Sequence, residues 1–248
     1  MPAILTTKEL SKRFGGVWAV DHANIEIEPR QVRSIIGPNG AGKTTLINII
    51  TGRLPATTGA VLYQGKDITK KPSHERVKMG ICRTFQINSI FLGLSVFENI
   101  RIAKQAQRGG SLKIFSSKKS LKEVNEETWS ILETIGMKDK AQIAARNLAH
   151  GDQRLLELGI ALAGKPNILF LDEPTAGMSK AETDRVAELI TDLAKDIAVV
   201  LVEHDMDVVM AISDKITVLY QGSVIAEGDP EAIKQNEMVR EAYLGREE

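Results

Sequence analysis

The chain has 248 residues, of which 43% are apolar and 26% charged, so it is long enough to bury a full core as one large domain or as a core with a subdomain. Its 32 basic residues are balanced by 32 acidic ones, which argues against a nucleic-acid partner because such proteins usually carry a basic excess. The single cysteine, Cys82, excludes a disulfide within the chain and fits a reducing compartment. The first residues lack the apolar stretch of a signal peptide, and the longest apolar runs are strand-sized, so we expect a membrane role only through a partner.

The amino-terminal part of the chain is rich in β-forming segments. Val17–Val20 and the alternating segment Asn24–Glu28 predict strands. The segment Val32–Ile36 predicts a buried strand that runs directly into a glycine-rich loop, and Lys43–Ile50 predicts a helix after that loop. This order of strand, loop and helix is the context that a phosphate-binding motif requires.

The second half of the chain alternates apolar strands with helices. Asn167–Leu171 and Ile197–Val202 predict buried strands, whereas Gln153–Ala163 and Lys180–Ala194 predict helices. The second of these helices follows a capping box at Ser179–Glu182. Such alternation is typical of a parallel sheet that is covered on both faces.

The stretch from about Phe97 to Asn147, between the phosphate loop and the later strands, is rich in lysine and glutamate and predicts helices. A second capping box, Ser120–Glu123, predicts the start of an amphipathic helix through Trp129 and Ile135. We therefore expect one domain over residues 1–248 with an inserted helical subdomain at about 97–163. Near the carboxyl end, Ile216–Leu219 and Ser223–Ala226 predict a hairpin.

The glycine-rich loop fits the pattern G-x-x-x-x-G-K-[ST], which binds nucleotide phosphates. Its glycines let backbone N–H groups point inward, and the following helix adds its positive amino-terminal end. Lys43 would supply a charge to the β- and γ-phosphates of ATP, and the Thr44 hydroxyl would bind Mg²⁺. The flanking strand and helix argue against a chance glycine-rich turn. The predicted ATP-binding residues are Gly37, Pro38, Asn39, Gly40, Ala41, Gly42, Lys43, Thr44 and Thr45.

Two carboxylates end the predicted strand at Asn167–Leu171. Ligands bind beyond the carboxyl ends of strands in open α/β sheets. Asp172 would hold the Mg²⁺ shell, and Glu173 would polarise the attacking water, because metal ligand and base must be adjacent but distinct. An apolar run followed by Asp-Glu is common, and the alternative is a capped strand end. The phosphate loop in the same chain favours the functional interpretation.

The segment Asn147–Arg154 precedes this strand and resembles the signature of the ATP-binding cassette (ABC) transporter ATPases, Leu-Ser-Gly-Gly-Gln at the start of a helix. The resemblance implies that the segment binds the γ-phosphate of ATP held by the opposite subunit, which suits the positive end of a helix. The sequence departs from the pattern at Ala149, His150 and Asp152. Loss of the serine hydroxyl removes a hydrogen bond to phosphate, about 1.5–3 kcal/mol for a charged acceptor. The residues predicted to act in trans are Leu148, Ala149, His150, Gly151 and Asp152.

Further motifs are similar to those of the same family and occur in the same order. The resemblance implies that Gln86 contacts Mg²⁺ and the attacking water and that His204 is the switch histidine. Ala176–Ser179 fills the position of the D-loop. Phe14 matches the aromatic residue that stacks on adenine, with core packing as the alternative, and Val20 would complete the apolar wall around the base. The predicted catalytic residues are Glu173, His204, Gln86 and Lys43, and the predicted metal ligands are Thr44, Gln86 and Asp172.

The resemblance spans about Leu5 to Gly245 and extends to the ATP-binding subunits of branched-chain, or hydrophobic, amino acid importers. It is carried by the segments Gly80–Gln86, Val96–Ile100, Glu203–Met206, Ala211–Lys215, Ile225–Pro230 and Ala242–Gly245. It implies an α/β fold: a P-loop ABC ATPase core with an amino-terminal antiparallel β subdomain and an inserted helical subdomain. It also implies hydrolysis of ATP with Mg²⁺ in a head-to-tail dimer at the cytoplasmic face of the inner membrane. The implied partners are a second ATPase subunit, identical or not, transmembrane permease subunits and, indirectly, a periplasmic solute-binding protein.

Three alternatives stay open at this point. Relatives with similar tails serve urea, amides or lipopolysaccharide export, so the transported solute is not fixed. A soluble ATPase of the superfamily usually carries two cassettes or a long coiled-coil insert, which this chain lacks. A non-enzymatic partner in a heterodimer would fit the altered Ala149 and Asp152, but the intact Lys43, Asp172 and Glu173 argue against it for this chain's own site.

Overall fold

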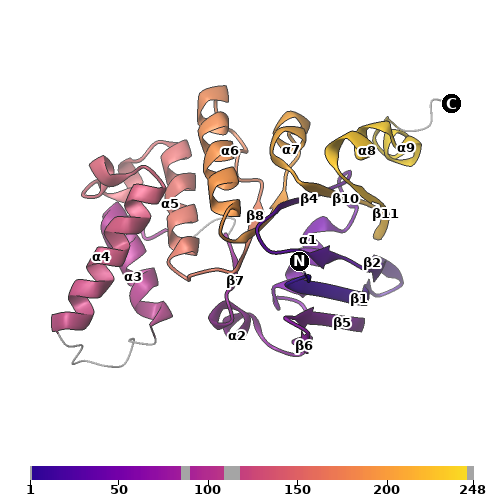
Figure 1. Ribbon diagram of the computed structural model, residues 1–248, viewed down its shortest axis with the longest axis horizontal. Helices are drawn as coiled ribbons and strands as arrows, with labels where there is room; N and C mark the ends of the chain where they lie inside the picture. The colour runs from indigo at the N-terminus through magenta and orange to yellow at the C-terminus, as the bar shows by residue number, and fades with distance from the viewer. Residues whose placement is uncertain (1, 85–89, 109–117, 245–248) are drawn as a thin grey trace. The chain divides into compact units, whose positions relative to one another are not determined.

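The computed structural model describes residues 2–84, 90–108 and 118–244 (Figure 1). Contacts within the chain define two compact units. The first combines residues 1–76 with 190–248, and the second spans residues 77–189. The phosphate loop and His204 belong to the first unit, whereas Asp172, Glu173 and the signature segment belong to the second.

The first unit contains an antiparallel sheet formed by the amino-terminal part of the chain. Its strand order is β2-β1-β5-β6, and β3 pairs with β1. The strands are β1 (Leu5–Phe14), β2 (Val17–Ala23), β3 (Glu26–Ile27), β5 (Thr58–Tyr63) and β6 (Lys66–Asp67). The antiparallel β subdomain is confirmed, but the strand expected at Asn24–Glu28 is reduced to two residues. The sequence patterns had not indicated β1, the longest strand of the described chain, because charged residues interrupt its apolar alternation.

The same unit holds the strand that carries the phosphate loop. β4 (Val32–Ile36) lies between β9 (Ala198–Val202) and β10 (Lys215–Tyr220) and is parallel to both. All five residues of β4 are buried, as predicted, although two of them, Arg33 and Ser34, are polar. The hairpin of β10 with β11 (Ser223–Gly228) is confirmed as an antiparallel pair. Helix α1 (Lys43–Ile50) begins and ends where the sequence predicted.

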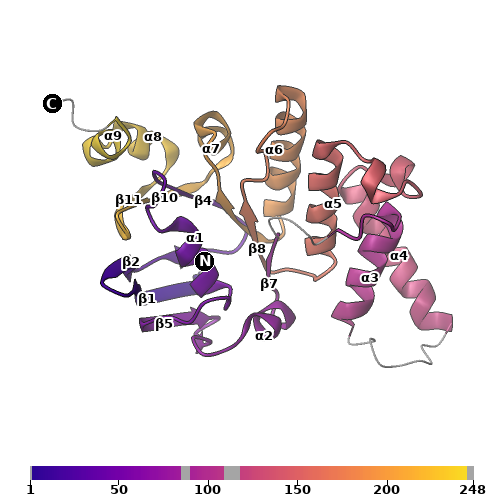
Figure 2. The same ribbon diagram turned by 180° about the vertical axis from the view of Figure 1, so that it is seen from behind.

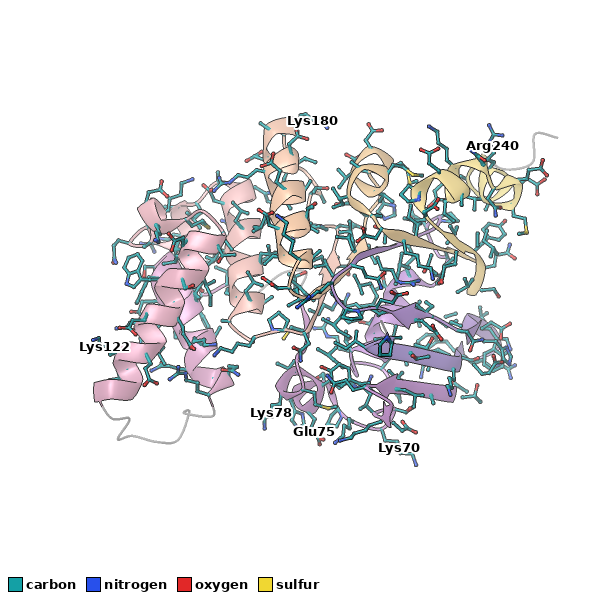
Figure 3. All side chains as sticks on the ribbon, in the orientation of Figure 1. Lys70, Glu75, Lys78, Lys122, Lys180 and Arg240 are labelled. Carbon is teal, nitrogen blue, oxygen red and sulfur yellow. The ribbon has the colours of Figure 1, made fainter. Side chains whose placement is uncertain are left out.

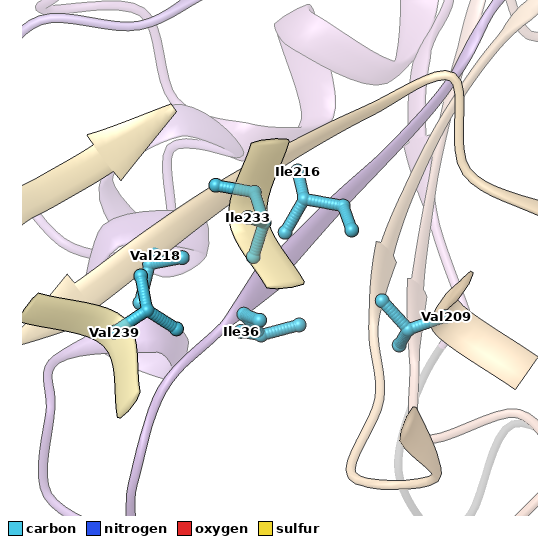
Figure 4. Close-up of a cluster of buried hydrophobic side chains, with 6 residues drawn as sticks. All are labelled: Ile36, Val209, Ile216, Val218, Ile233 and Val239. Carbon is cyan, nitrogen blue, oxygen red and sulfur yellow. The ribbon is translucent and has the colours of Figure 1, made fainter. Parts of the chain in front are cut away.

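Three short helices complete the first unit: α7 (Met206–Ile212), α8 (Pro230–Gln235) and α9 (Glu237–Leu244). Both α8 and α9 lie beside β11 (Figures 1 and 2). Their apolar residues join a buried cluster with the end of β4 and with β10 (Figure 4), which consists of Ile36, Val209, Ile216, Val218, Ile233 and Val239. The carboxyl-terminal helices therefore pack against the residue that directly precedes the phosphate loop.

The second unit contains two parallel strands and several helices. β7 (Ile81–Arg83) pairs with β8 (Ile168–Asp172), and all eight residues are buried. Helices α3 (Val96–Gln107) and α4 (Lys118–Thr134) lie side by side, and α5 (His150–Leu162) contacts both of them (Figures 1 and 2). Two short 3₁₀ turns, η1 (Lys138–Lys140) and η2 (Ala145–Asn147), connect α4 to α5. Two further helices extend across the limits of the unit, α2 (Ser73–Lys78) and α6 (Lys180–Ala194).

Two helix starts differ from the sequence prediction. Helix α5 begins at His150, three residues before Gln153, so the signature segment itself forms the first turn. Helix α4 already includes Lys118, so the expected capping residue Ser120 lies within the helix and the capping-box prediction at this position is wrong. The capping box at Ser179 is present, because the Glu182 carboxylate accepts hydrogen bonds from both the backbone N–H and the hydroxyl of Ser179. The limits of the helical subdomain, 97–163, stay a prediction.

Charged side chains cover the surface of both units, and Lys70, Lys122, Lys180 and Arg240 are exposed examples (Figure 3). Within the described ranges, we find no helix with both the length and the apolar character needed to cross a membrane.

Candidate functional site

The phosphate loop connects β4 to α1 through glycines that no other residue could replace without strain. Gly42 has a φ of 101° and caps α1, and a Cβ atom there would lie 2.1 Å from the Ala19 carbonyl oxygen. A Cβ at Gly37, whose φ is 151°, would lie 2.1 Å from the Leu219 carbonyl oxygen. The backbone of the loop therefore packs directly on two neighbouring strands, and the glycines are required by both conformation and space.

Lys43 folds back over this loop. Its ammonium group donates to the carbonyl oxygens of Gly37 at 2.6 Å and Pro38 at 3.1 Å, and the residue is only 7% exposed. Thr44, the expected metal ligand, is exposed, and Thr45 is partly buried. A buried ammonium held over a loop with a helix amino-terminus forms a positive cradle for phosphate.

Two neighbouring segments anchor the loop. The N–H of Gly222, in the β10–β11 turn, donates to the Ala41 carbonyl at 3.0 Å, and the N–H of Asp21 donates to the Gly222 carbonyl at 2.8 Å. From α9, the Tyr243 hydroxyl hydrogen-bonds to the backbone of Gly37; burial raises the pKa of this tyrosine, and the Gly37 contact partly offsets that rise. Sequence reasoning used Tyr243 only as part of a family tail and missed this contact with the loop.

His204 follows β9 at the same edge of the sheet where the phosphate loop follows β4. Ile35 of β4 is paired with Val202 of β9, and Gly37 and His204 each come two residues later. His204 is exposed, and its backbone N–H donates to the Glu203 carboxylate at 2.8 Å. The structure thus brings together the predicted loop and the predicted switch histidine.

The aromatic residue expected to stack on adenine lies at the end of β1. Phe14 is 49% exposed, so the alternative of core packing does not hold. Val20 is fully buried inside the sheet and presents no surface to a base, so its expected place in the wall around adenine is not supported. Val17 and Trp18, next to Phe14 across the β1–β2 hairpin, are the exposed apolar neighbours that sequence reasoning missed.

In the second unit, Asp172 ends β8 as predicted, but its carboxylate already has a cationic partner. Nη2 of Arg83 donates to Oδ2 of Asp172 at 2.6 Å, and the two side chains are 7% and 5% exposed. The sequence patterns assign Arg83 no role beyond its place in the family segment Gly80–Gln86. A signal for the pairing was available, because parallel neighbours place their last residues at the same edge of a sheet.

Glu173, the residue after Asp172, has an unusual backbone conformation. Its φ is 48°, a left-handed value that few residues other than glycine adopt. Such strain persists where the surrounding structure imposes it, and it is concentrated at functional sites. The side chain of this expected base is partly buried, directly beyond the end of the strand.

The signature segment forms the first turn of α5. Ala149 is the N-cap residue but has no side-chain hydrogen bond to the helix, and His150 is exposed. Gly151 packs on α6, because a Cβ there would lie 2.4 Å from the Glu182 carboxylate. The Asp152 carboxylate accepts a hydrogen bond from Lys140 at 2.6 Å. The amino-terminal end of α5 is therefore accessible to an anion at Ala149. The Asp152 carboxylate in the same turn is paired with Lys140.

Gln86 lies outside the described residues, so its expected contacts with Mg²⁺ and water stay a prediction. Cys82 is buried in β7, as expected for a structural strand thiol, and burial raises its pKa to about 11.

Comparison with known proteins places this arrangement in a family. The profile of the ABC transporter family matches residues 20–176, and that of the branched-chain amino acid ATP-binding cassette transporters matches residues 223–248. The chain is 41% identical to the high-affinity branched-chain amino acid transport ATP-binding protein LivG of Escherichia coli K12, over 98% of each chain. It is 40% identical to the corresponding protein BraF of Pseudomonas aeruginosa, again over 98% of each chain.

A solved structure agrees with the sequence relatives. The ADP conformation of MJ1267, an ATP-binding cassette of an ABC transporter, is 32% identical, with a TM-score of 0.86 over 99% of this chain and 100% of that one. The expected fold class is therefore confirmed, and nucleotide binding and ATP hydrolysis follow from the family. The chain belongs to the ATP-binding subunits of ABC transporters, in the branched-chain amino acid branch of that family.

Proposed function

We propose that the chain is the ATP-hydrolysing subunit of a membrane importer of branched-chain or other hydrophobic amino acids. The observation that carries this proposal is the phosphate loop, held by Gly37, Gly42 and the folded-back Lys43, in a chain whose full-length relatives are transport ATPases for these amino acids. The match at residues 223–248 adds support, because that profile belongs to this branch rather than to cassettes in general.

The residues divide the chemistry of hydrolysis between them. The loop N–H groups and Lys43 bind the ATP phosphates. Thr44 and Asp172 offer a hydroxyl and a carboxylate oxygen, the hard donors that Mg²⁺ prefers, and with Gln86 they would hold it next to the phosphates. Bound Mg²⁺ supplies positive charge that offsets the charge developing on the transferred phosphoryl group.

Glu173 accepts the proton of the attacking water, and its imposed backbone orients the carboxylate for that single role. His204, on the turn that follows β9, contributes a hydrogen bond to the γ-phosphate. Phe14 stacks on adenine from the edge of the antiparallel sheet, as its exposure permits.

The second half of each site comes from another ATPase subunit. The amino-terminal end of α5, with Leu148, Ala149, His150, Gly151 and Asp152, offers N–H groups to the γ-phosphate of ATP bound by the partner. We propose that the dimer is head-to-tail and attaches to permease subunits at the cytoplasmic face of the membrane. A periplasmic solute-binding protein would deliver the amino acid to those subunits.

The test is reconstitution of the chain with the permease subunits and solute-binding protein of its transporter. We expect ATP hydrolysis in proteoliposomes to rise when leucine, isoleucine or valine is added with the binding protein, and labelled amino acid to accumulate inside. If urea or an amide stimulates ATP hydrolysis and the amino acids do not, the chain serves a related transporter instead. Outward movement of lipopolysaccharide would overturn import altogether.

A further inference from the structure

Arg33 places a charged guanidinium in the interior of the first unit, on the strand that leads into the phosphate loop. The residue is fully buried. Its Nη1 donates to Thr217 Oγ1 and to Glu227 Oε2, in both cases at 2.7 Å. Both acceptors belong to the β10–β11 hairpin, which lies beside β4 in the same sheet (Figure 1). The Nη1 end of the guanidinium is therefore fixed by contacts within one unit.

The opposite edge of the same guanidinium has no acceptor. Nε and Nη2 form this edge of the planar group, and neither has a hydrogen-bond partner among the residues that the structure describes. Gln31 lies two residues earlier on the same face of the extended chain, is 8% exposed, and its Nε2 also lacks an acceptor. Buried donors without an acceptor are costly, and those found in native proteins often mark a bound water or ion. Three buried donors on one face thus indicate an acceptor that the protein itself does not supply.

Arg76 shows how the same unit satisfies a buried guanidinium with protein atoms alone. This residue is 1% exposed. Its three side-chain nitrogens all donate to backbone carbonyl oxygens, those of Lys71, Ile49, Ile50 and Thr69. Arg33 is as deeply buried, yet two of its three nitrogens have no such acceptor in the described chain. The contrast is specific to the surroundings of Arg33 and does not reflect burial of an arginine in general.

The charges around Arg33 favour an anion over a water molecule. Lys215 Nζ lies 2.7 Å from Glu227 Oε1, so Arg33 and Lys215 share one carboxylate. Burial by itself raises the pKa of Glu227, but the hydrogen bonds from Lys215 and Arg33 lower it below its usual range, so this carboxylate stays ionised. Glu227 is the one carboxylate of the described chain within ion-pair distance of Arg33. Lys215 is partly exposed to water, whereas Arg33 is not, so the excess positive charge is least screened at Arg33.

We propose that the Nε–Nη2 edge of Arg33, together with the Gln31 amide, binds one compact monovalent anion such as chloride inside the first unit. The two N–H groups of this edge form a rigid fork that suits an anion, and the ion offsets the excess positive charge. Because Arg33 has no exposed surface, the ion is enclosed and is limited to a few atoms. The site is separate from the phosphate loop, so this inference does not rest on the proposed function.

The first experiment measures urea unfolding of the full chain while chloride replaces gluconate at constant ionic strength, which keeps charge screening unchanged. A ligand that binds only the folded state stabilises it in proportion to the logarithm of its concentration. We expect the unfolding equilibrium constant to fall about tenfold for each tenfold rise in chloride above the dissociation constant, as for one bound ion. Unfolding that is independent of chloride overturns the inference.

Three variants locate the effect. Arg33→Met removes both orphaned guanidinium donors and the charge, and we expect it to lose the chloride dependence. Gln31→Leu keeps the guanidinium fork and removes the amide donor, so we expect it to shift the dependence to several-fold higher chloride. Arg76→Met is the matched control, because it also loses a buried arginine of the first unit but should keep the dependence of the wild type. An Arg33→Met protein that responds to chloride like the wild type overturns the inference.

The second experiment uses the wild type alone and therefore decides the question even if Arg33→Met does not fold. Crystals of the full chain are grown with bromide in place of chloride, and the anomalous scattering of bromide is measured. We expect a peak in hydrogen-bonding contact with both Nε and Nη2 of Arg33. A water molecule or a protein acceptor at this position, without an anomalous peak, overturns the inference. A bromide peak without any chloride dependence in solution shows binding at crystal concentration only and also overturns it.

Discussion

Lys140 donates a hydrogen bond of 2.6 Å to Asp152, one of the altered residues of the signature segment. Asp152 is the third residue of α5, at the helix end that is proposed to bind the partner's γ-phosphate. A negative charge there would repel phosphate, but Lys140 neutralises it locally. Where the signature pattern has glutamine, this chain therefore has an acid together with its own counter-ion.

We expect Lys140→Gln to weaken ATP-driven dimerisation by about 0.5–1 kcal/mol, a few-fold, because it leaves the Asp152 charge next to the phosphate site. Asp152→Gln should restore dimerisation in the double variant. Sedimentation of the dimer, formed with ATP in a hydrolysis-deficient background, measures the effect. Lys138→Gln is the control, since Lys138 pairs instead with Glu133. Equal dimerisation of the Lys140 and Lys138 variants would contradict this account.

Ala149 is an N-cap residue without a capping side chain, so Ala149→Ser should stabilise the chain. A serine at this position accepts a hydrogen bond from the helix, worth about 1 kcal/mol. We also expect its hydroxyl to raise ATP turnover by contacting phosphate across the dimer. Urea unfolding and an ATPase assay measure the two effects. Ser95→Ala calibrates the scale, because Ser95 caps α3 by accepting from the Glu98 N–H, and its loss should cost about as much as Ala149→Ser gains. A more stable variant with unchanged turnover would show that the departure from serine is harmless to catalysis.

The predicted and observed elements agree best where one local pattern determines the structure. Val32–Ile36 and Lys43–Ile50 match β4 and α1 residue for residue, because the glycine-rich loop between them ends the strand and its last glycine precedes the helix. Leu5–Phe14 was missed because its apolar residues do not alternate regularly, and its pairing with β2 and β5 contains register shifts. Tertiary pairing, rather than the local sequence, makes this segment a strand.

In the site as well, local motifs indicate where residues lie along the chain, whereas contacts between residues far apart in the sequence depend on the fold. The motifs placed Lys43 at the start of the helix after the phosphate loop, and Asp172 and His204 at or just after the carboxyl ends of strands, and the structure has them there. Spacing within each motif does not show that Arg83 pairs with Asp172, since 89 positions separate them; only the pairing of their two strands brings them to one edge of the sheet. The buried position of Val20 depends on packing of the whole sheet, which the local sequence does not show, and it gives no support to the expected contact with adenine.

Glu173→Gln should slow ATP hydrolysis at least about a hundredfold while ATP binding is retained. The amide preserves shape and the left-handed backbone at φ 48° but accepts a proton poorly. The variant should accumulate as an ATP-bound dimer, which size-exclusion chromatography with light scattering detects. Glu188→Gln, an exposed change on α6, is the control and should behave as the wild type. Near-normal turnover of Glu173→Gln in a single-site assay would remove Glu173 from the catalytic role.

Tyr243→Phe should lower nucleotide affinity by about 0.5–1.5 kcal/mol, the usual net value of one hydrogen bond. The phenyl ring keeps its packing, but the loop loses the hydroxyl that hydrogen-bonds to the Gly37 backbone. Titration with a fluorescent ATP analogue measures the change. Tyr63→Phe, in the distant β5 strand, serves as control. If both variants bind ATP like the wild type, the carboxyl-terminal helix does not position the phosphate loop.

Cys82 should resist alkylation in the folded protein and destabilise it in alkali. Burial raises its pKa to about 11 from an ordinary value of 9.0. Below about pH 9 the thiol is neutral in both states and has no effect; between about pH 9 and 11 the unfolded thiol ionises and the folded one does not. The free energy of unfolding therefore falls over that window, by at most about 2–3 kcal/mol.

The measurement compares urea unfolding of the wild type and Cys82→Ala at about pH 8 and about pH 10.5, on either side of the ordinary thiol pKa. Other lysine and tyrosine groups titrate in both proteins, so only the difference between them reports on Cys82. We expect the wild type to lose more stability than the variant, and iodoacetamide to label the wild type only when urea unfolds it. Rapid labelling of the folded chain would show instead that β7 opens readily, and with it the strand that holds Arg83 against Asp172.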